Sequence, residues 1–64
     1  MPWNEHDYPQ SLKNFNPEVR NKAVEIANAL LEEGFEEGSA IAIATDRAED
    51  WAKNRGIPIR QDEG

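Results

Sequence analysis

Two stretches of the chain repeat apolar residues at the three- and four-residue spacing of an amphipathic helix. The first opens at Asn16-Pro17, where the asparagine side chain can cap the helix and proline fits its first turn, and closes at Gly34. Its apolar side chains cover nearly half of the helical circumference: Val19, Ala23, Val24, Ile26, Ala27, Leu30 and Leu31. An arc this wide predicts a central helix with neighbours on two sides.

The second stretch begins between Glu36 and Ser39 and runs to about Asn54, where Gly56 and then Pro58 stop it. Small side chains on its apolar face predict a close approach to the first helix. The residues that share this face are Ile41, Ala44, Ala48, Trp51 and Ala52.

A shorter helix is predicted from Pro9 to about Asn14. Proline suits the first position of a helix, and Leu12 and Phe15, three residues apart, place two apolar groups on one side. So short a helix persists only when it docks on the rest of the fold.

We therefore expect an all-α fold, a small three-helix domain with a short N-terminal helix packed on an antiparallel helix pair. Residues 1–64 form a single helical domain, with a partly ordered arm at residues 1–7 and a mobile tail at about residues 58–64. A domain of this size needs large side chains in its core. The aromatic residues expected there are Trp3, Tyr8 and Trp51.

Composition narrows the classes of function. The chain has 64 residues, no cysteine and a net charge of −6, which favours solubility and repels phosphate backbones and anionic membranes. The first residues carry neither the basic segment nor the apolar run of a signal peptide, and no stretch approaches the roughly 18 apolar residues of a membrane span. We expect a cytoplasmic protein, a monomer or weak homodimer, with no membrane association.

Four glutamates surround the turn between the two long helices: Glu32, Glu33, Glu36 and Glu37. Their oxygens are the ligands that calcium or magnesium would take, but the alternating Asp/Asn pattern of a calcium loop is missing. The favoured interpretation is a solvated turn without a metal. Because Glu32 and Glu33 oppose the helix dipole, a basic partner docking there is the other interpretation.

A helix-turn-helix protein is the alternative for a short turn between two helices. Its recognition helix would be led by Glu36 and Glu37 and would expose Asp46, Glu49 and Asp50, which would repel DNA. A small basic patch can form only from residues near the end of the chain: Lys53, Arg55 and Arg60. Nucleic-acid binding is therefore the weaker hypothesis.

Catalytic residues are not apparent in the sequence. His6, beside Asp7, is the single imidazole, and no serine or cysteine nucleophile is visibly placed near it. The hydroxyl residues are better explained as helix-surface or capping residues: Ser11, Ser39 and Thr45. We expect no enzymatic activity, no catalytic residue and no cofactor.

One apolar residue does not fit the face of the second helix. Ile43 lies away from the Ile41/Ala48 face and closer to Arg47 and Asn54. Either the N-terminal arm covers it, or it is exposed at an interface with a partner. The predicted interaction surface combines Ile43 and Arg47 with the four glutamates of the turn.

Several blocks of the sequence resemble the YdaT-like small proteins of Gram-positive bacteria, an uncharacterised family. The resemblance rests on these blocks: Met1-Pro2-Trp3, Asp7-Tyr8-Pro9, Ser11-Leu12-Lys13-Asn14, Val19-Arg20, Lys22-Ala23, Glu25-Ile26-Ala27-Asn28-Ala29-Leu30-Leu31, Gly34, Glu37-Gly38, Ala40-Ile41-Ala42-Ile43-Ala44, Ala48-Glu49 and Trp51. It implies that longer relatives carry a further domain after this segment, and it supplies no catalytic residue.

The Tyr8-Pro9 start followed by Ser11-Leu12-Lys13 is also similar to the ChaB family, named as putative cation-transport regulators. That similarity implies a cation-linked regulator as an alternative. The function itself is unknown from the sequence, which predicts a small non-enzymatic helical module acting through protein contacts.

Overall fold

Two antiparallel helices form the body of the protein in a computed structural model that describes residues 2–61. Helix α1 spans Pro17–Glu32 and helix α2 spans Glu37–Arg55, and a 3₁₀ turn, η1, covers Gln10–Leu12. Within residues 2–61 no strand forms, apart from an isolated antiparallel bridge between Phe15 and Arg60. The all-α class and the antiparallel pair are confirmed.

The third helix of the predicted three-helix domain is not present. The segment expected to be helical from Pro9 to about Asn14 makes a single 3₁₀ turn, in which the Leu12 N–H donates to the Pro9 carbonyl over 3.0 Å. It cannot continue because Phe15 bridges to Arg60 in an extended conformation. Asn16 also has an extended backbone, as expected for a residue directly before a proline.

Both predicted ends of α1 are confirmed. Asn16 caps the helix, its Oδ1 accepting the Glu18 N–H over 3.2 Å. At the other end Gly34 has φ 101°, a left-handed conformation that glycine adopts without strain. The Phe35 N–H then reaches back to the Leu30 carbonyl over 3.1 Å, as in a Schellman motif.

Helix α2 begins within the predicted interval. Glu36 occupies its N-cap position without a side-chain hydrogen bond. Gly56, with φ 70°, ends the helix, and the Ile57 N–H donates to the Ala52 carbonyl over 2.9 Å. Lys53 and Arg55 in the last turn stabilise the negative end of the helix dipole.

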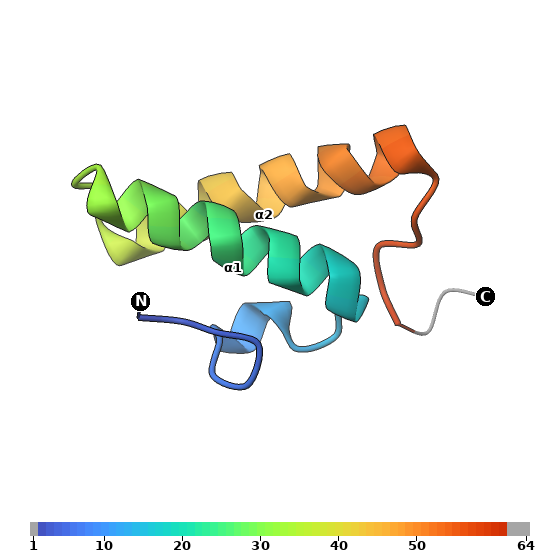
Figure 1. Cartoon of the computed structure of the whole chain (residues 1–64), viewed down its shortest axis with the longest axis horizontal. Coiled ribbons are helices and arrows are strands. Elements are labelled where there is room, and N and C mark those ends of the chain that lie inside the picture. The colour runs from blue at the N-terminus through green and yellow to red at the C-terminus, as the bar shows by residue number, and fades with distance from the viewer. Residues whose placement is uncertain (1, 62–64) are drawn as a thin grey trace.

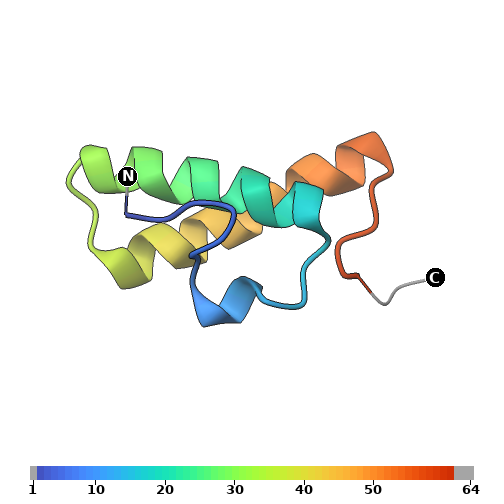
Figure 2. The ribbon, with the colours of Figure 1, turned by 60° about the horizontal axis from the view of Figure 1, so that its bottom comes forward.

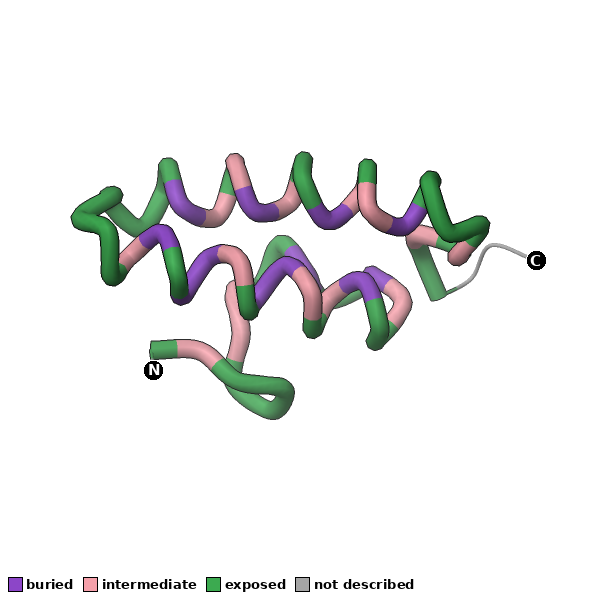
Figure 3. The backbone as a smooth tube through the Cα atoms, turned by 45° about the horizontal axis from the view of Figure 1, so that its top comes forward, coloured by how far each residue is buried: buried purple, intermediate pink, exposed green. Residues whose placement is uncertain are grey.

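The core between the helices is asymmetric. Helix α2 contributes a stripe of alanines, each at most 1% exposed: Ala40, Ala44, Ala48 and Ala52. These buried positions face α1 (Figure 3). The fully buried large side chains, Leu12 and Val19, belong to the N-terminal segment and α1. Alanine therefore permits the close approach of the helices, and the bulk of the core comes from outside α2.

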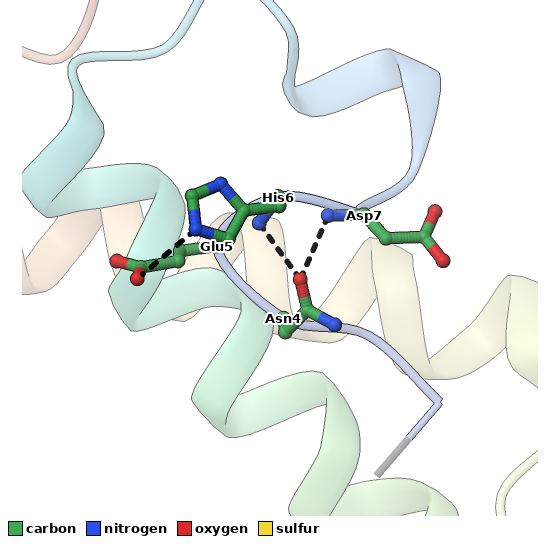
Figure 4. A network of polar contacts seen from close by, with 4 residues as sticks. All are labelled: Asn4, Glu5, His6 and Asp7. Carbon is green, nitrogen blue, oxygen red and sulfur yellow. Dashed lines mark hydrogen bonds and ion pairs between the residues drawn. The ribbon is translucent and has the colours of Figure 1, made fainter.

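The N-terminal segment covers the side of α1 that α2 leaves free (Figures 1 and 2). Trp3 and Tyr8 are half-buried and pack against the core, and Trp3 is hydrogen-bonded to the buried Asn28 of α1. The chain between them folds into a tight turn in which Asn4 Oδ1 accepts the His6 and Asp7 N–H groups (Figure 4). Helix α1 is thus a central helix with two covered sides.

The first four residues of the predicted mobile tail, residues 58–61, are hydrogen-bonded to the segment that leads into α1. Ile59 is partly buried and packs against the core. Four hydrogen bonds join the two segments: Asn16 N–H to the Ile59 carbonyl (2.8 Å), Asn16 Nδ2 to the Pro58 carbonyl (3.0 Å), Gln61 N–H to the Asn14 carbonyl (3.1 Å) and Gln61 Nε2 to the Phe15 carbonyl (3.2 Å). The rest of the tail, residues 62–64, lies outside the described residues.

Candidate interaction surface on the helix pair

The two flanks of the helix pair differ in what covers them. On α1, Asn28 holds the N-terminal segment, whereas Lys22 contacts Trp51 of α2. Six positions along a helix correspond to a rotation of about 120°, so Asn28 and Lys22 lie on different flanks of α1. Trp51 therefore marks the flank that the N-terminal segment does not cover.

Residues four apart lie in one row on a helix, so Ile43 and Arg47 share this flank with Trp51. Ile43 is half-buried and Arg47 is exposed. We define the open seam as this row together with its neighbours on α1: Ile43, Arg47, Trp51, Lys22, Glu25 and Ile26. Its apolar members are half-buried, so the seam has an apolar centre between charged side chains.

The seam is hollowed at the end nearest Trp51. An open hollow of about 340 Å³ is lined by Trp51 and by one side of α1: Glu18, Asn21, Lys22 and Glu25. Lys22 Nζ lies 3.2 Å from Glu25 Oε1 and extends along the wall of the hollow. The indole forms the apolar part of the surface, and the α1 side chains supply both signs of charge.

Two cations lie close to the Trp51 ring. Lys22 Nζ is 5.4 Å from the ring centroid and Arg55 Cζ is 5.2 Å away, within the range of a cation–π interaction. Two further arginines stack in the same way, Arg20 over Tyr8 at 4.5 Å and Arg60 over Phe15 at 5.5 Å. Four of the seven basic residues are thus placed over rings. In residues 2–61 only Lys22 among the lysines and arginines pairs with a carboxylate.

The structure brings together part of the predicted interaction surface. Ile43 and Arg47 belong to one row, as the sequence indicated. The four glutamates of the turn are all exposed. They lie before Ile43 in the chain, and even the last of them, Glu37, is six residues or about 9 Å of helix away from it. Ile43 is half-buried, and the helical spacing puts it on the flank of Trp51 rather than on that of Asn28, which holds the N-terminal segment.

Sequence reasoning missed the α1 half of the seam and the role of Trp51. Lys22 and Glu25 have the composition of any solvated helix face. Trp51 was expected in the core, and it does pack against the core, but as a half-buried residue whose ring is partly open to the surface. The signal that could have found the seam is the spacing of four from Ile43 to Arg47 to Trp51, read together with the matching row on α1.

The acidic turn and the single histidine do not form a metal centre in the part of the chain that the structure describes. Between residues 2 and 61 no three His, Asp or Glu side chains converge as metal ligands. His6 Nε2 lies 3.5 Å from Glu5 Oε1, and both side chains are largely exposed (Figure 4). Over the same residues, neither long helix has the length and apolar character required to cross a bilayer.

These features define a small all-α domain built on an antiparallel helix pair. The chain is similar to the uncharacterised protein YdaT of Bacillus subtilis (strain 168), with 59% identity over 54 residues, 84% of this chain and 36% of the relative. The resemblance to YdaT-like proteins is confirmed, and the chain spans little more than a third of that relative's length. No protein-family model matches the chain. No solved structure matches it either. These comparisons assign no function and give no support to the ChaB-like or nucleic-acid-binding alternatives.

Proposed function

We propose that this chain is a non-enzymatic interaction domain that binds a protein partner through the open seam. The observation that carries the proposal is the half-buried Trp51, which forms one side of an open hollow on the uncovered flank. The opposite flank has its own cover, the N-terminal segment with Trp3. The N-terminal segment thus completes the core on one flank of the helix pair, whereas the flank with Trp51 remains open.

The composition of the seam supports this proposal. Protein interfaces combine an apolar centre with a polar rim, and tryptophan and arginine are enriched among the residues that dominate binding energy. Ile26, Ile43 and Trp51 provide the centre, while Lys22 and Arg47 belong to the rim. Trp51 is already restrained by Lys22 and Arg55, so little side-chain freedom is lost when a partner covers it.

The same proposal places the protein in the cytoplasm, in keeping with a chain that contains no cysteine. It assigns docking rather than catalysis to the seam, because the hollow presents a tryptophan, an amide, one lysine and two glutamates. None of these is arranged as a nucleophile with an adjacent base.

Affinity capture with variants of the seam tests the proposal. The tagged chain would be compared with Ile43→Asp, which places a charge in the apolar centre, and with Arg47→Glu on the rim. Lys13→Glu is the matched control, because it makes the same charge reversal at an exposed site on the N-terminal segment. Loss of the same bound protein from both seam variants, but not from the control, is expected. Equal capture by all four chains would show that the seam is not the binding surface.

A further inference from the structure

We propose that residues 2–9, which we call the strap, detach from α1 and uncover a groove that binds an extended segment of a partner protein. While it is attached, the strap occupies this groove and competes with that segment. The groove is centred on Asn28, on a different flank of α1 from the open seam. The inference therefore goes beyond the proposed function and concerns a second surface.

The strap meets α1 near its two ends. Trp3 and Tyr8 are half-buried, whereas the four residues between them are exposed: Asn4, Glu5, His6 and Asp7. These four residues form a turn that is closed on itself. The Asn4 and Asp7 backbones exchange hydrogen bonds of 2.9 and 3.3 Å, and Asn4 Oδ1 accepts two further N–H groups (Figure 4). Detachment of the strap therefore leaves the hydrogen bonds of the turn intact.

The attachment at Trp3 is polar. Over residues 2–61, the hydrogen bonds between the strap and α1 are the reciprocal pair that joins Asn28 to Trp3. When the strap lifts, water can replace both bonds, so neither the amide nor the Trp3 backbone is left buried without a partner. An apolar residue at this position of α1 would instead be exposed to water on opening. Contacts that form and break reversibly are less apolar than permanent ones, and the contact at Asn28 has this character.

The attachment at Tyr8 carries an unsatisfied donor. Arg20 Cζ lies 4.5 Å from the centroid of the Tyr8 ring. Arg20 Nε is buried and has no hydrogen-bond partner in the described part of the chain, and Nη1 reaches the Phe15 carbonyl only over 3.4 Å. A buried N–H without an acceptor lowers the stability of the attached state. Detachment of the Tyr8 ring admits water to the guanidinium and removes this cost.

The chain is anchored again directly after the strap. Leu12 is 1% exposed and Phe15 is 5% exposed, so both stay in the core when the strap moves. The hinge therefore lies between Pro9 and Leu12, within the single 3₁₀ turn. On α1, Val24 and Leu31 lie four residues before and three residues after Asn28, and they place apolar side chains on both sides of the amide.

The contacts of the strap define the chemistry that the groove accepts. Asn28 pairs with the N–H and the carbonyl of one residue, and every residue except proline offers both groups. The side chain of that residue, Trp3, packs against the core. Main-chain bonds of this kind give an extended peptide its affinity, and the place for its side chain gives specificity. The expected occupant is therefore an extended segment with a large aromatic side chain at the position of Trp3.

The strap and the groove belong to one chain, which sets the strength of the competition. A short linker gives the strap a local concentration on the order of millimolar at the groove. The apparent affinity for a partner falls with the fraction of molecules in which the strap is detached. A weakened strap should therefore increase the affinity for a segment added in trans, and a damaged groove should abolish it. An N-terminal segment with a purely structural role predicts neither effect.

Titration of the isotope-labelled chain with a synthetic peptide of residues 2–9, capped at both ends, tests the competition by NMR. Trp3→Ala weakens the strap but leaves the groove on α1 unchanged. The peptide should shift the signals of the Asn28 side-chain amide and bind this variant roughly tenfold more tightly than the original chain. Glu5→Gln is the matched control, because Glu5 is exposed within the turn, and it should bind as the original chain does. A peptide with a methyl group on the Trp3 nitrogen lacks the donor and should not bind.

Hydrogen exchange of the unmodified chain provides a second test that does not depend on a variant. The Trp3 N–H should exchange through local opening, at a rate that low concentrations of denaturant barely change. Core amides of α1, such as that of Ala27, should exchange through global unfolding. Exchange of the Trp3 N–H only by global unfolding would overturn the strap.

The titration can also contradict the inference. Equal affinity of the peptide for the original chain and for a folded Trp3→Ala chain would show that the strap does not compete. Absence of any shift at Asn28 in that variant with millimolar peptide would show that the groove does not bind extended segments. Ile43→Asp and Arg47→Glu lie on the other flank and should leave peptide binding unchanged. Failure of the strap therefore does not decide the capture experiment on the seam, and failure of the seam does not decide this one.

Discussion

Asn28 and Trp3 exchange a reciprocal pair of hydrogen bonds across the interface of α1 with the N-terminal segment. Asn28 Nδ2 donates to the Trp3 carbonyl over 2.9 Å, and the Trp3 N–H donates to Asn28 Oδ1 over 3.3 Å. Asn28 is only 3% exposed, the sole buried polar residue in the core of residues 2–61. Because both hydrogen bonds of the buried Asn28 amide go to the backbone of Trp3, they hold Trp3 in a single register against α1.

Replacement of Asn28 by leucine, which has a similar size, is therefore expected to release the N-terminal segment. Two hydrogen bonds are lost, and the free energy of unfolding should fall by roughly 1–3 kcal/mol. Urea denaturation measures the loss, and fluorescence of Trp3 in a Trp51→Phe background reports its exposure. Asn21→Leu on the exposed face of α1 is the matched control. Unchanged Trp3 emission in the Asn28 variant would show that other contacts hold the segment.

The alanine stripe of α2 predicts a strong sensitivity to added volume. Ala48 has no exposed surface, and leucine at this position would force α1 and α2 apart. Overpacking of this kind costs about 1–3 kcal/mol, a large part of the stability of so small a domain. Thermal unfolding should show a clear decrease in Tm for Ala48→Leu. The same change at the exposed Ala42 should leave Tm almost unchanged, and equal effects at both positions would contradict the close packing.

Asn16 performs two tasks that substitution can separate. Its Oδ1 caps α1, and its Nδ2 donates to the Pro58 carbonyl. Asn16→Asp keeps the capping acceptor and loses the donor, so only the attachment of the C-terminal segment should weaken. Asn16→Ala loses both, with a cost of about 1 kcal/mol for the cap alone. Amide hydrogen exchange at Gln61, whose N–H is bonded to Asn14, should increase in both variants. Protection that survives in Asn16→Asp would contradict a role for the side-chain donor.

Ile43 and Ile41 form a matched pair on opposite flanks of α2. Both are half-buried, but Ile43 shares its row with Trp51, whereas Ile41 belongs to the flank on the side of the N-terminal segment. Ile43→Asp should leave thermal stability nearly unchanged and weaken partner binding. Ile41→Asp should lower Tm by several degrees, because it places a charge at a half-buried position on the flank of Asn28. A loss of several kcal/mol for Ile43→Asp would identify Ile43 as a core residue instead.

The helix pair could be predicted because its signals are local. Asn16-Pro17, Gly34 and Gly56 each act within one helical turn, and the structure places all of these boundaries as predicted. The segment from Pro9 carried a helical signal just as local, yet it makes only a 3₁₀ turn because Phe15 pairs with the distant Arg60. Long-range partners override local propensity, and a single sequence does not reveal them.

The seam could be predicted only in part for the same reason. The helical wheel identified Ile43 as out of place and put Arg47 beside it. It could not say which flank the N-terminal segment covers, because that depends on the contact of Asn28 with Trp3, 25 residues away. Once that contact is known, the position of Trp51 beside Lys22 defines the open flank.

The attachments at the two ends of the chain have a consequence for the order of folding. α1 and α2 are joined by a short turn, whereas Asn28 bonds to a residue 25 positions away and Gln61 to one 46 positions away. Closing a longer loop costs more chain entropy, so contacts near in sequence form sooner. The helix pair should therefore form first as a fast local step. The N-terminal segment should then attach to α1, and the C-terminal segment to the residues just before α1. Trp3 and Ile59, which pack against the core from the two ends of the chain, should accordingly be among the last side chains to leave water.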